Sequence, residues 1–135
     1  MTDVKAQGGN ETVLLVEDDP QLRTLIARGL TSVGYNVLQA ENGARALDVA
    51  DAYKAPIHIV VSDVEMPDMD GPELFRNLRR WYPRLRFLFI SGRMEQAEAD
   101  VSLDGRTAFL PKPFSMEALY SFVRYVLDRA DGLAG

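Results

Sequence analysis

The sequence contains no cysteine and a single histidine, His58. Without cysteine there is no disulfide framework, and thiolate chemistry at a metal or redox centre is excluded. This absence fits a reducing compartment. A single histidine also makes a histidine-rich metal site and a histidine phosphotransfer protein implausible. His58 lies within an apolar run, so we expect it in the core.

Long apolar runs and an excess of basic residues are missing as well. No run approaches the roughly 18 residues that a membrane-spanning helix needs, and the N-terminus lacks the pattern of a signal peptide. The 15 basic residues are outnumbered by 20 acidic ones, which gives a net charge of −5. Non-specific binding to nucleic acid or to an anionic membrane needs a basic face. We therefore expect a cytoplasmic protein that binds neither.

What the sequence does contain is the composition of an ordinary folded domain. Of its 135 residues, 47% are apolar and 26% are charged, and these values are average for a globular protein. This length corresponds to one domain, which we place at residues 11–130. We expect a flexible polar leader over residues 1–10 and a frayed tail over residues 131–135.

Strand-like and helix-like patterns alternate five times along this domain. Apolar and β-branched runs predict strands at 12–17, 36–40, 57–62, 86–90 and 107–111. Apolar residues at helical spacing predict helices at 20–33, 42–52, 72–81, 94–100 and 115–130. Leu25 and Trp81 are among the residues expected to face the core. The alternation predicts a parallel sheet with helices on both faces, and Pro111 places the last strand at a sheet edge.

Four of the predicted strands end in reactive polar groups. These groups are Glu17, Asp18 and Asp19 after the first strand, Asp63 after the third, Ser91 after the fourth and Lys112 after the fifth. The carboxyl ends of parallel strands meet at one edge of a sheet. We therefore expect these side chains to share one crevice, where an open α/β sheet places its ligand site.

This set of groups suits metal-assisted phosphoryl transfer. Two carboxylates about 4 Å apart repel each other by about 4 kcal/mol at an effective dielectric constant of about 20, and a divalent cation removes that cost. Ligands that are all oxygen, with one or two direct carboxylates, fit Mg²⁺. Lys112 offers a point charge and Ser91 a hydroxyl to phosphate oxygens. A carboxylate can itself be the nucleophile and form an acyl phosphate.

Each of these residues also has a plain structural interpretation. Asp19 can be a helix N-cap, and Asp63 and Ser91 can be turn residues. Lys112 can be a solvated surface lysine. Independent structural roles nevertheless explain poorly why all of these residues stand at strand ends in this order.

Four motifs resemble those of the receiver domain of two-component response regulators. They are Leu15-Val16-Glu17-Asp18-Asp19, Asp63-Val64-Glu65-Met66-Pro67-Asp68-Met69-Asp70-Gly71, Ile90-Ser91-Gly92 and Lys112-Pro113-Phe114. The intervals between them are near the family's spacing, and the resemblance covers residues 11–130. It implies a flavodoxin-like α/β fold, a doubly wound five-stranded parallel sheet of order 2-1-3-4-5.

The resemblance implies a role for each site residue. Asp63 would be the phosphoacceptor, which takes its phosphoryl group from the phosphohistidine of a histidine kinase or a phosphotransfer protein. The ligands of Mg²⁺ would be Asp18, Asp19, Asp63 and the backbone carbonyl of Glu65. The Glu65 side chain could order or repel a water molecule at the acyl phosphate.

A further set of residues would transmit the signal. Ser91 and Lys112 would contact the phosphoryl oxygens, and the movement of Ser91 would make room for the switch aromatic Phe109 to turn. A downstream protein would read the face formed by the last two helices and the strand between them. Phe109 can equally be plain edge-strand packing. The Lys112–Pro113 bond would be cis.

Three features depart from the family pattern. The hydroxyl residue is Ser91 rather than the commoner threonine. Gly92 beside it should widen access for a phosphodonor or for water. The helix predicted near 94–100 has little apolar face.

We interpret the chain as a Mg²⁺-dependent phosphoacceptor of a two-component phosphorelay, with no enzymatic activity beyond its own phosphorylation and autodephosphorylation. One alternative is a Mg²⁺-dependent phosphatase or phosphotransferase that acts on small molecules. Its only motif, the DxDG at 68–71, follows a proline loop rather than a strand, so a turn with Asp70 as N-cap is preferred. Another alternative is a degenerate receiver that only binds proteins. The module can be a stand-alone regulator or the receiver of a hybrid kinase.

Overall fold

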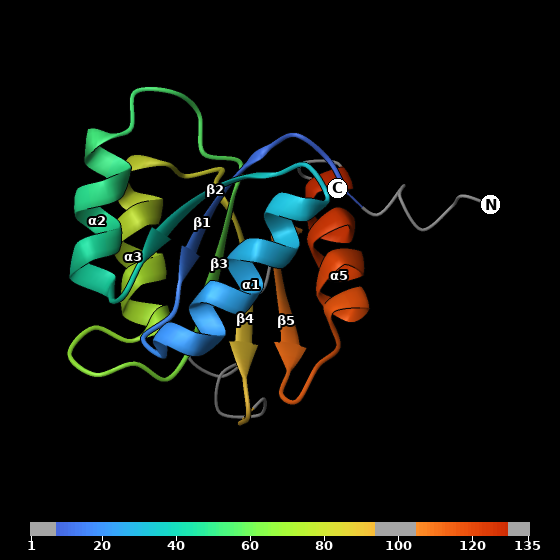
Figure 1. Cartoon of the computed structure of the whole chain (residues 1–135). Helices are drawn as coiled ribbons and strands as arrows, with labels where there is room; N and C mark the ends of the chain where they lie inside the picture. The colour runs from blue at the N-terminus through green and yellow to red at the C-terminus, as the bar shows by residue number, and fades with distance from the viewer. Residues whose placement is uncertain (1–7, 94–104, 130–135) are drawn as a thin grey trace.

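The structure, a computed structural model, describes residues 8–93 and 105–129 (Figure 1). It contains a five-stranded parallel sheet of order β2-β1-β3-β4-β5, which confirms the predicted doubly wound α/β fold. The strands are β1 (Thr12–Val16), β2 (Asn36–Ala40), β3 (Ile59–Asp63), β4 (Arg86–Ser91) and β5 (Thr107–Pro111). The helices are α1 (Pro20–Ser32), α2 (Gly43–Ala52), α3 (Gly71–Trp81) and α5 (Met116–Asp128).

Several predicted segments fall outside these described ranges. They are the helix near 94–100, the tail at 131–135 and the leader up to residue 7. Within 8–93 and 105–129, no helix combines the length and the apolar character that crossing a membrane requires.

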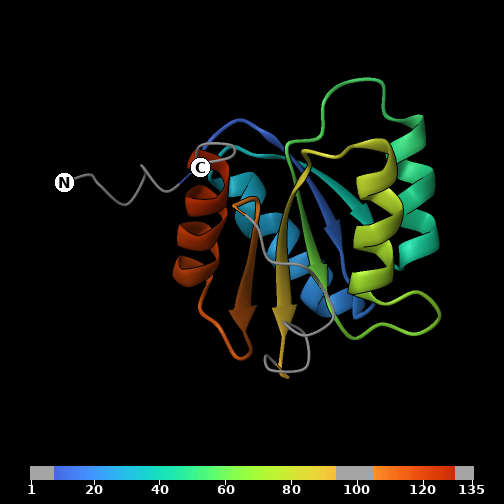
Figure 2. The ribbon, with the colours of Figure 1, turned by 180° about the vertical axis from the view of Figure 1, so that it is seen from behind.

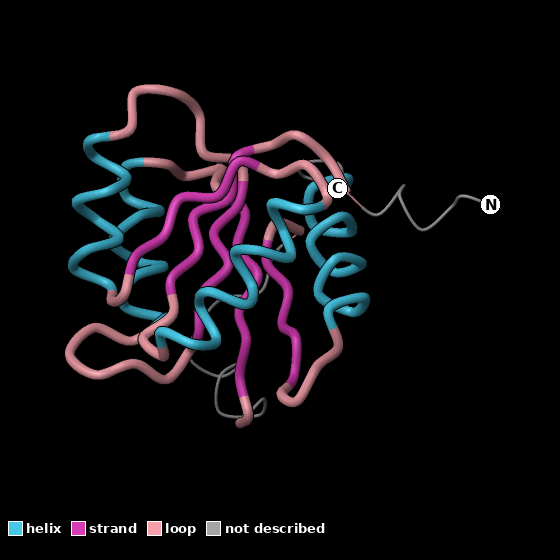
Figure 3. Tube along the Cα trace, viewed as in Figure 1, coloured by secondary structure: helices cyan, strands magenta, loops and turns pink. Residues whose placement is uncertain are grey.

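Two of the described helices cover each face of the sheet. α1 and α5 lie on one face and α2 and α3 on the other, as the opposite views of Figures 1 and 2 and the tube in Figure 3 show. Successive residues of a strand point to opposite faces. In β1, Leu14 and Val16 therefore join the core beneath α2 and α3, and Val13 and Leu15 join the core beneath α1 and α5. A strand covered on both faces is apolar at nearly every position, and in β1 only Thr12 at its start is polar.

Pro111 lies at the edge of the sheet, as predicted. β5 pairs with β4 and is the last strand in the order. Proline has no N–H to donate to a neighbouring strand, so an edge tolerates it. The next amide, that of Lys112, donates to the Ser91 carbonyl at 2.9 Å and keeps the two strand ends together.

Side-chain caps set where the helices begin. Asp19, Asn42, Asp70 and Ser115 each accept a backbone N–H from the first turn of α1, α2, α3 and α5 respectively. Proline stands in the first turn of α1 and α3, where its missing N–H costs nothing. α1 and α3 therefore start close to the carboxyl edge of the sheet. Gly34, just after α1, has a φ of 108°, which favours glycine.

Arg124 of α5 closes the opposite, amino-terminal edge of the sheet. Its guanidinium donates to both carboxylate oxygens of Glu11, at 2.7 and 3.1 Å, and to the Tyr35 hydroxyl at 3.3 Å. It also donates to the Gly8 carbonyl at 3.2 Å and forms an ion pair with Asp128 at 2.8 Å. Hydrogen bonds from Arg124 hold the pKa of Glu11 below its usual value. All the charges of this cluster are thus paired.

Three predicted core residues lie at the surface instead. Leu25 is 56% exposed because the apolar stripe of α1 is wider than the strip that contacts the sheet. Trp81 is 77% exposed: it is the last residue of α3 and lies beside an open hollow with Ile57, which precedes β3. His58 is exposed at the amino edge of the sheet, where its Nδ1 accepts the Thr12 N–H at 2.9 Å. The periodicity of apolar residues located these helices and this strand correctly. It did not show that these three residues lie beyond the surface that the sheet covers.

Candidate functional site

The polar strand ends meet at one edge of the sheet, as expected. Asp63 is the last residue of β3 and Ser91 the last of β4. Glu17 follows β1 directly, and Lys112 follows β5. The strands are parallel and their ends are in register, so these residues share the edge toward which the arrowheads in Figure 1 point.

Three carboxylates gather where β1 and β3 end. Glu17, Asp18 and Asp63 each offer one oxygen, and these oxygens lie within 4.8 Å of one another. Glu17 is 2% exposed and Asp63 4%, whereas Asp18 is exposed. In the described parts of the chain, Oε1 of Glu17 and Oδ1 of Asp63 have no hydrogen-bond partner. A buried carboxylate oxygen without any partner, such as Oε1 of Glu17, is costly, and a set of oxygens like this one is what a hard divalent cation accepts.

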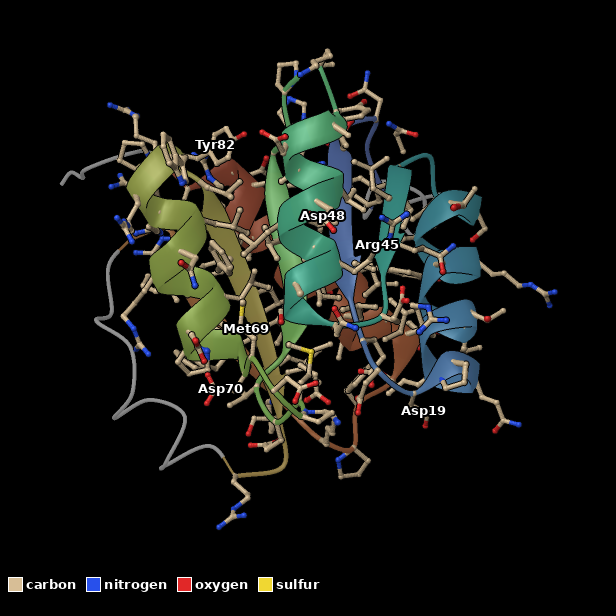
Figure 4. The ribbon with its side chains drawn as sticks, turned by 90° about the vertical axis from the view of Figure 1, so that its left-hand side faces the viewer. Asp19, Arg45, Asp48, Met69, Asp70 and Tyr82 are labelled. Carbon is tan, nitrogen blue, oxygen red and sulfur yellow. The ribbon has the colours of Figure 1, made fainter. Side chains whose placement is uncertain are left out.

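Asp19, which the resemblance places among the metal ligands, is not part of this cluster. Its Oδ1 accepts two backbone N–H groups of α1, at 3.0 and 3.4 Å, so it is the cap of that helix. Figure 4 shows it at the same end of the molecule as Asp70, the cap of α3. Its own N–H donates to Oε2 of Glu17 at 3.1 Å and orients that carboxylate.

A signal in the sequence could have found Glu17. Pro20 follows Asp19, and a proline at the first helical position marks the residue before it as the N-cap. The carboxylate pair that remains for the site then lies one residue earlier, at Glu17 and Asp18.

Lys112 faces Asp63 across the site. Its Nζ lies 3.2 Å from Oδ1 and donates a hydrogen bond to Oδ2, also at 3.2 Å. The lysine is only partly buried, so its ammonium group reaches the carboxylate from the rim. The bond from Lys112 to Pro113 is cis, as the resemblance implied.

Burial shifts the titration of two of these carboxylates. It raises the pKa of Glu17 from 4.5 to about 7, the hydrogen bond from the Asp19 N–H opposes this, and the charge of Asp63 adds to it. Burial also raises the pKa of Asp63 above its usual value, against the lowering effect of Lys112. A cation bound between the carboxylates would favour the charged form of both. The site is therefore short of positive charge.

The hydroxyl of Ser91 is engaged with Glu65. Ser91 is 0% exposed, and its Oγ donates to Oε2 of Glu65 at 3.0 Å while it accepts the Arg93 N–H at 2.8 Å. Glu65 itself is exposed. The sequence assigned no contact to this side chain, because the two residues lie 26 positions apart and no local pattern joins them.

Gly71 fixes the segment that follows β3. A Cβ at this position would lie 2.8 Å from the Asp63 carbonyl oxygen, too close for any side chain. The Gly71 N–H donates to the Val64 carbonyl at 2.9 Å. Asp68 has a φ of 71° and Asp70 caps α3, so both belong to the turn. This agrees with the interpretation of 68–71 as a turn and helix start rather than a phosphatase motif.

Phe109 lies inward, beneath the site. It is 8% exposed and stacks on Phe89, with ring centroids 5.3 Å apart and an angle of 25° between the rings. Phe89 in turn contacts Phe75 and Phe87, which also contact each other, so the four aromatic rings form one cluster. Packing and switching are both compatible with this position.

An apolar hollow adjoins Lys112 on the outer surface. Its lining consists of Leu22, Leu25, Lys112, Pro113, Phe114 and Met116. The exposed Leu25 thus belongs to a surface that borders the carboxyl edge of the sheet rather than to the core.

The arrangement as a whole suits attack by a carboxylate on phosphorus. Asp63 offers an oxygen that accepts no hydrogen bond from the described residues, beside one ammonium group and two further carboxylates. A carboxylate can form an acyl phosphate once the charge on the reacting oxygens is neutralised.

Known proteins similar to this chain are signalling proteins. The response regulator receiver domain family matches residues 13–124. The sensor kinase CckA of Brucella abortus is 44% identical over 124 residues, which cover 91% of this chain and 13% of the kinase. This chain spans 13% of the length of that kinase and 51% of the length of the response regulator MprA of Mycobacterium avium, to which it is 38% identical.

Solved structures of single receiver domains match over nearly their whole length. The receiver domain of the hybrid histidine kinase CckA is 35% identical with a TM-score of 0.73, and the match covers 87% of this chain and 99% of that one. The chemotaxis protein CheY4 of Vibrio cholerae is 31% identical with a TM-score of 0.76, and the match covers 88% and 100%.

Proposed function

The chain belongs to the response regulator receiver domain family of two-component signalling, and from this premise we propose that Asp63 accepts the phosphoryl group. The observation that carries the proposal is the condition of this carboxylate. It is buried at the end of β3, its Oδ1 accepts no hydrogen bond from the described residues, and the Lys112 ammonium lies 3.2 Å away. A carboxylate nucleophile needs an available oxygen. It also needs a nearby cation that can stabilise the negative charge on the phosphoryl oxygens during transfer.

The transfer is an in-line displacement. An oxygen of Asp63 attacks the phosphorus of a phosphohistidine, the P–N bond breaks as the P–O bond forms, and the departing imidazole takes up a proton from water. Lys112 and the Ser91 hydroxyl then donate to phosphoryl oxygens. Later attack of water on the phosphorus releases phosphate and restores the carboxylate. The chain thus acts on its own phosphoryl group rather than turning over a separate substrate.

Four oxygen ligands fit Mg²⁺ at this site. They come from the carboxylates of Glu17, Asp18 and Asp63 and, by the family resemblance, from the backbone carbonyl of Glu65. Glu17 takes the place of Asp19, whose carboxylate caps α1. Support comes from the oxygen-only set and from the buried Oε1 of Glu17. When bound, the ion would neutralise charge on the attacking and transferred oxygens.

A histidine kinase or a phosphotransfer protein is the phosphodonor. Its phosphohistidine must reach Asp63, so the donor has to rest on surfaces that border the carboxyl edge of the sheet. The apolar hollow beside Lys112, with exposed Leu25 on α1, supplies such a surface. The downstream face includes β5, which carries Phe109, and α5. Its third predicted element, the helix near 94–100, lies outside the described residues.

The similarity to a sensor kinase favours a receiver within a hybrid kinase over a stand-alone regulator. The module has to meet a kinase that is charged by ATP, so its location is cytoplasmic.

Incubation with acetyl phosphate and Mg²⁺ tests the proposed acceptor. Mass spectrometry of the intact chain should show one added phosphoryl group, stable in acid and lost in base. Asp63→Asn should abolish it. Asp48→Asn, at a residue exposed on α2 (Figure 4), is the matched control and should leave it unchanged.

Other outcomes would favour the alternatives. A phosphoryl group retained by Asp63→Asn would refute the acceptor. Sustained hydrolysis of many unrelated phosphoesters would identify a phosphatase, and Mg²⁺ binding without phosphorylation would identify a binding platform.

A further inference from the structure

The Ser91 hydroxyl can donate one hydrogen bond, and it already donates that bond to the Glu65 carboxylate. Oγ of Ser91 donates to Oε2 of Glu65 at 3.0 Å, and it also accepts the Arg93 N–H at 2.8 Å. A hydroxyl is a single donor. While this contact lasts, Ser91 cannot donate to a phosphoryl oxygen on Asp63.

We propose that Glu65 is a positioning residue that acts as a latch: its carboxylate holds the Ser91 hydroxyl away from the phosphoryl site, and phosphorylation must displace it. This inference rests on the proposed function, because it assumes a phosphoryl group on Asp63. In the proposed switch the first step is a hydrogen bond from the Ser91 hydroxyl to the phosphoryl group. The Glu65 carboxylate competes for that same hydroxyl. Glu65 thereby sets how readily the phosphorylated state is reached.

Burial and charge make the latch reversible. Ser91 is 0% exposed and cannot turn to water for a substitute partner, so its proton has two candidate acceptors, Glu65 and the phosphoryl group. Glu65 is exposed, and water can solvate its carboxylate once Ser91 leaves. A phosphoryl group carries more negative charge than a carboxylate and offers three acceptor oxygens. The Ser91 hydroxyl therefore leaves Glu65 and donates to the phosphoryl group instead. This change of acceptor costs the charge-assisted hydrogen bond between Ser91 and Glu65.

Glu65 could also oppose phosphorylation by charge repulsion alone, because its carboxylate is near enough to Asp63 to raise the pKa of that group. The two effects respond differently to substitution. Glu65→Ala removes both the charge and the acceptor, whereas Glu65→Gln removes the charge and keeps an acceptor for Ser91. Charge repulsion needs no Ser91, so it should persist in a Ser91→Ala background.

A double-mutant cycle separates these effects. The affinity for beryllium fluoride, a phosphoryl mimic, is measured by calorimetry in saturating Mg²⁺ for wild type, Glu65→Ala, Ser91→Ala and the double variant. Glu65→Ala should raise the affinity about fivefold more in the wild-type background than in Ser91→Ala, the equilibrium equivalent of about one net hydrogen bond. Glu65→Gln should raise the affinity for beryllium fluoride less than Glu65→Ala does. An equal gain from Glu65→Ala in both backgrounds would overturn the latch.

The free energy of unfolding of the same four proteins, measured both without ligand and with beryllium fluoride bound, gives a second test. The two substitutions should be non-additive in the unliganded protein, where the hydrogen bond exists, and additive with beryllium fluoride bound, where it does not. Non-additivity that persists in the bound state would mean a merely structural contact and would overturn the latch. If wild type neither binds beryllium fluoride nor accepts phosphate from acetyl phosphate, the proposed function itself fails. Normal phosphorylation with an uncoupled pair overturns only the latch.

Discussion

Two glutamates flank β1, and their surroundings are opposite. Glu11, before the strand, is held by Arg124 at 2.7 and 3.1 Å, and these hydrogen bonds lower its pKa. Glu17, after the strand, is 2% exposed, and its Oε1 has no hydrogen-bond partner among the residues the structure describes. Burial raises the pKa of Glu17 to about 7. One end of β1 has its charge paired, and the other holds a charge without a partner.

This difference shows which edge of the sheet serves stability and which serves a ligand. A paired carboxylate favours the folded state, whereas a buried unpaired one disfavours it. Perturbed groups of the second kind cluster at functional sites. The hydrogen bond from the Asp19 N–H offsets part of the cost of charging Glu17. In the proposed function a bound cation would offset the rest, so affinity for the ligand would be obtained at the expense of stability in its absence.

Removing Arg124, which pairs with Glu11 at the amino-terminal end of β1, should have the largest effect on the free energy of unfolding. Arg124→Met removes the partner of Glu11, Tyr35 and Asp128 and leaves Glu11 half-buried. We expect the free energy of unfolding to fall by about 2–3 kcal/mol, measured by urea denaturation. Arg28→Met, at an exposed position of α1, is the matched control and should change it by less than about 0.5 kcal/mol. Equal effects of both variants would show that the Arg124 cluster adds no stability.

Neutralising the unpaired end should mainly affect metal binding. Glu17→Gln should weaken Mg²⁺ binding about tenfold or more, roughly 1.4 kcal/mol, while the metal-free protein becomes more stable. Glu11→Gln is the same change at the paired end and should lower stability without altering Mg²⁺ affinity. Calorimetric titration with Mg²⁺ and thermal unfolding measure both quantities. An undiminished Mg²⁺ affinity in Glu17→Gln would remove Glu17 from the ligand set.

The two glutamates should give stability opposite dependences on pH. The pKa of Glu11 is lower in the folded state, so its contribution is complete above its ordinary value of 4.5 and is lost as the pH falls through the folded pKa. The pKa of Glu17 is raised to about 7, so stability is lost as the pH rises from 4.5 toward and through 7.

Urea denaturation of wild type, Glu11→Gln and Glu17→Gln across this pH range measures each contribution. The loss on the acid side should shrink in Glu11→Gln, and the loss between 4.5 and 7 should shrink in Glu17→Gln. Profiles that neither substitution changes would contradict both assignments.

The smallest effect on stability should come from Gly92→Ala at the open edge. A Cβ there would meet no described atom within 4 Å, so we expect a change below about 0.5 kcal/mol. Gly71→Ala is the contrasting variant, because its Cβ would lie 2.8 Å from the Asp63 carbonyl oxygen and should destabilise the fold. If Gly92 widens access as predicted, its alanine variant should hold the phosphoryl group longer. An unchanged lifetime would contradict that prediction.

The sheet and its polar edge could be predicted from the sequence because both follow from local patterns. Apolar runs separated by helical segments determine a parallel sheet. Asp63, Ser91 and Lys112 end such runs or directly follow them, and parallel pairing brings them together with no further information.

Features that depend on competition between residues were harder to predict. Asp19 and Glu17 both stand near the end of β1, and the one signal that separates them is Pro20, which marks Asp19 as the cap of α1 and leaves Glu17 for the site. The contact between Ser91 and Glu65 joins residues 26 positions apart. Periodicity records neither choice, because both depend on which partner is within reach after folding.

Periodicity also failed where an apolar helix face extends beyond the sheet. Leu25 and Trp81 obey the helical spacing of their segments, yet both are exposed. The spacing gives the direction of a side chain around its helix. It does not give the extent of the surface that the helix covers.

The exposed position of Trp81 makes the chain convenient for fluorescence. It is the only tryptophan of the sequence and is 77% exposed. α3 carries it about 15 Å from Gly71, the residue that adjoins Asp63. Its emission should be that of a hydrated indole, which iodide quenches readily. A shift of this emission toward shorter wavelengths after phosphorylation would therefore report an event at the far end of α3, not the chemistry at Asp63.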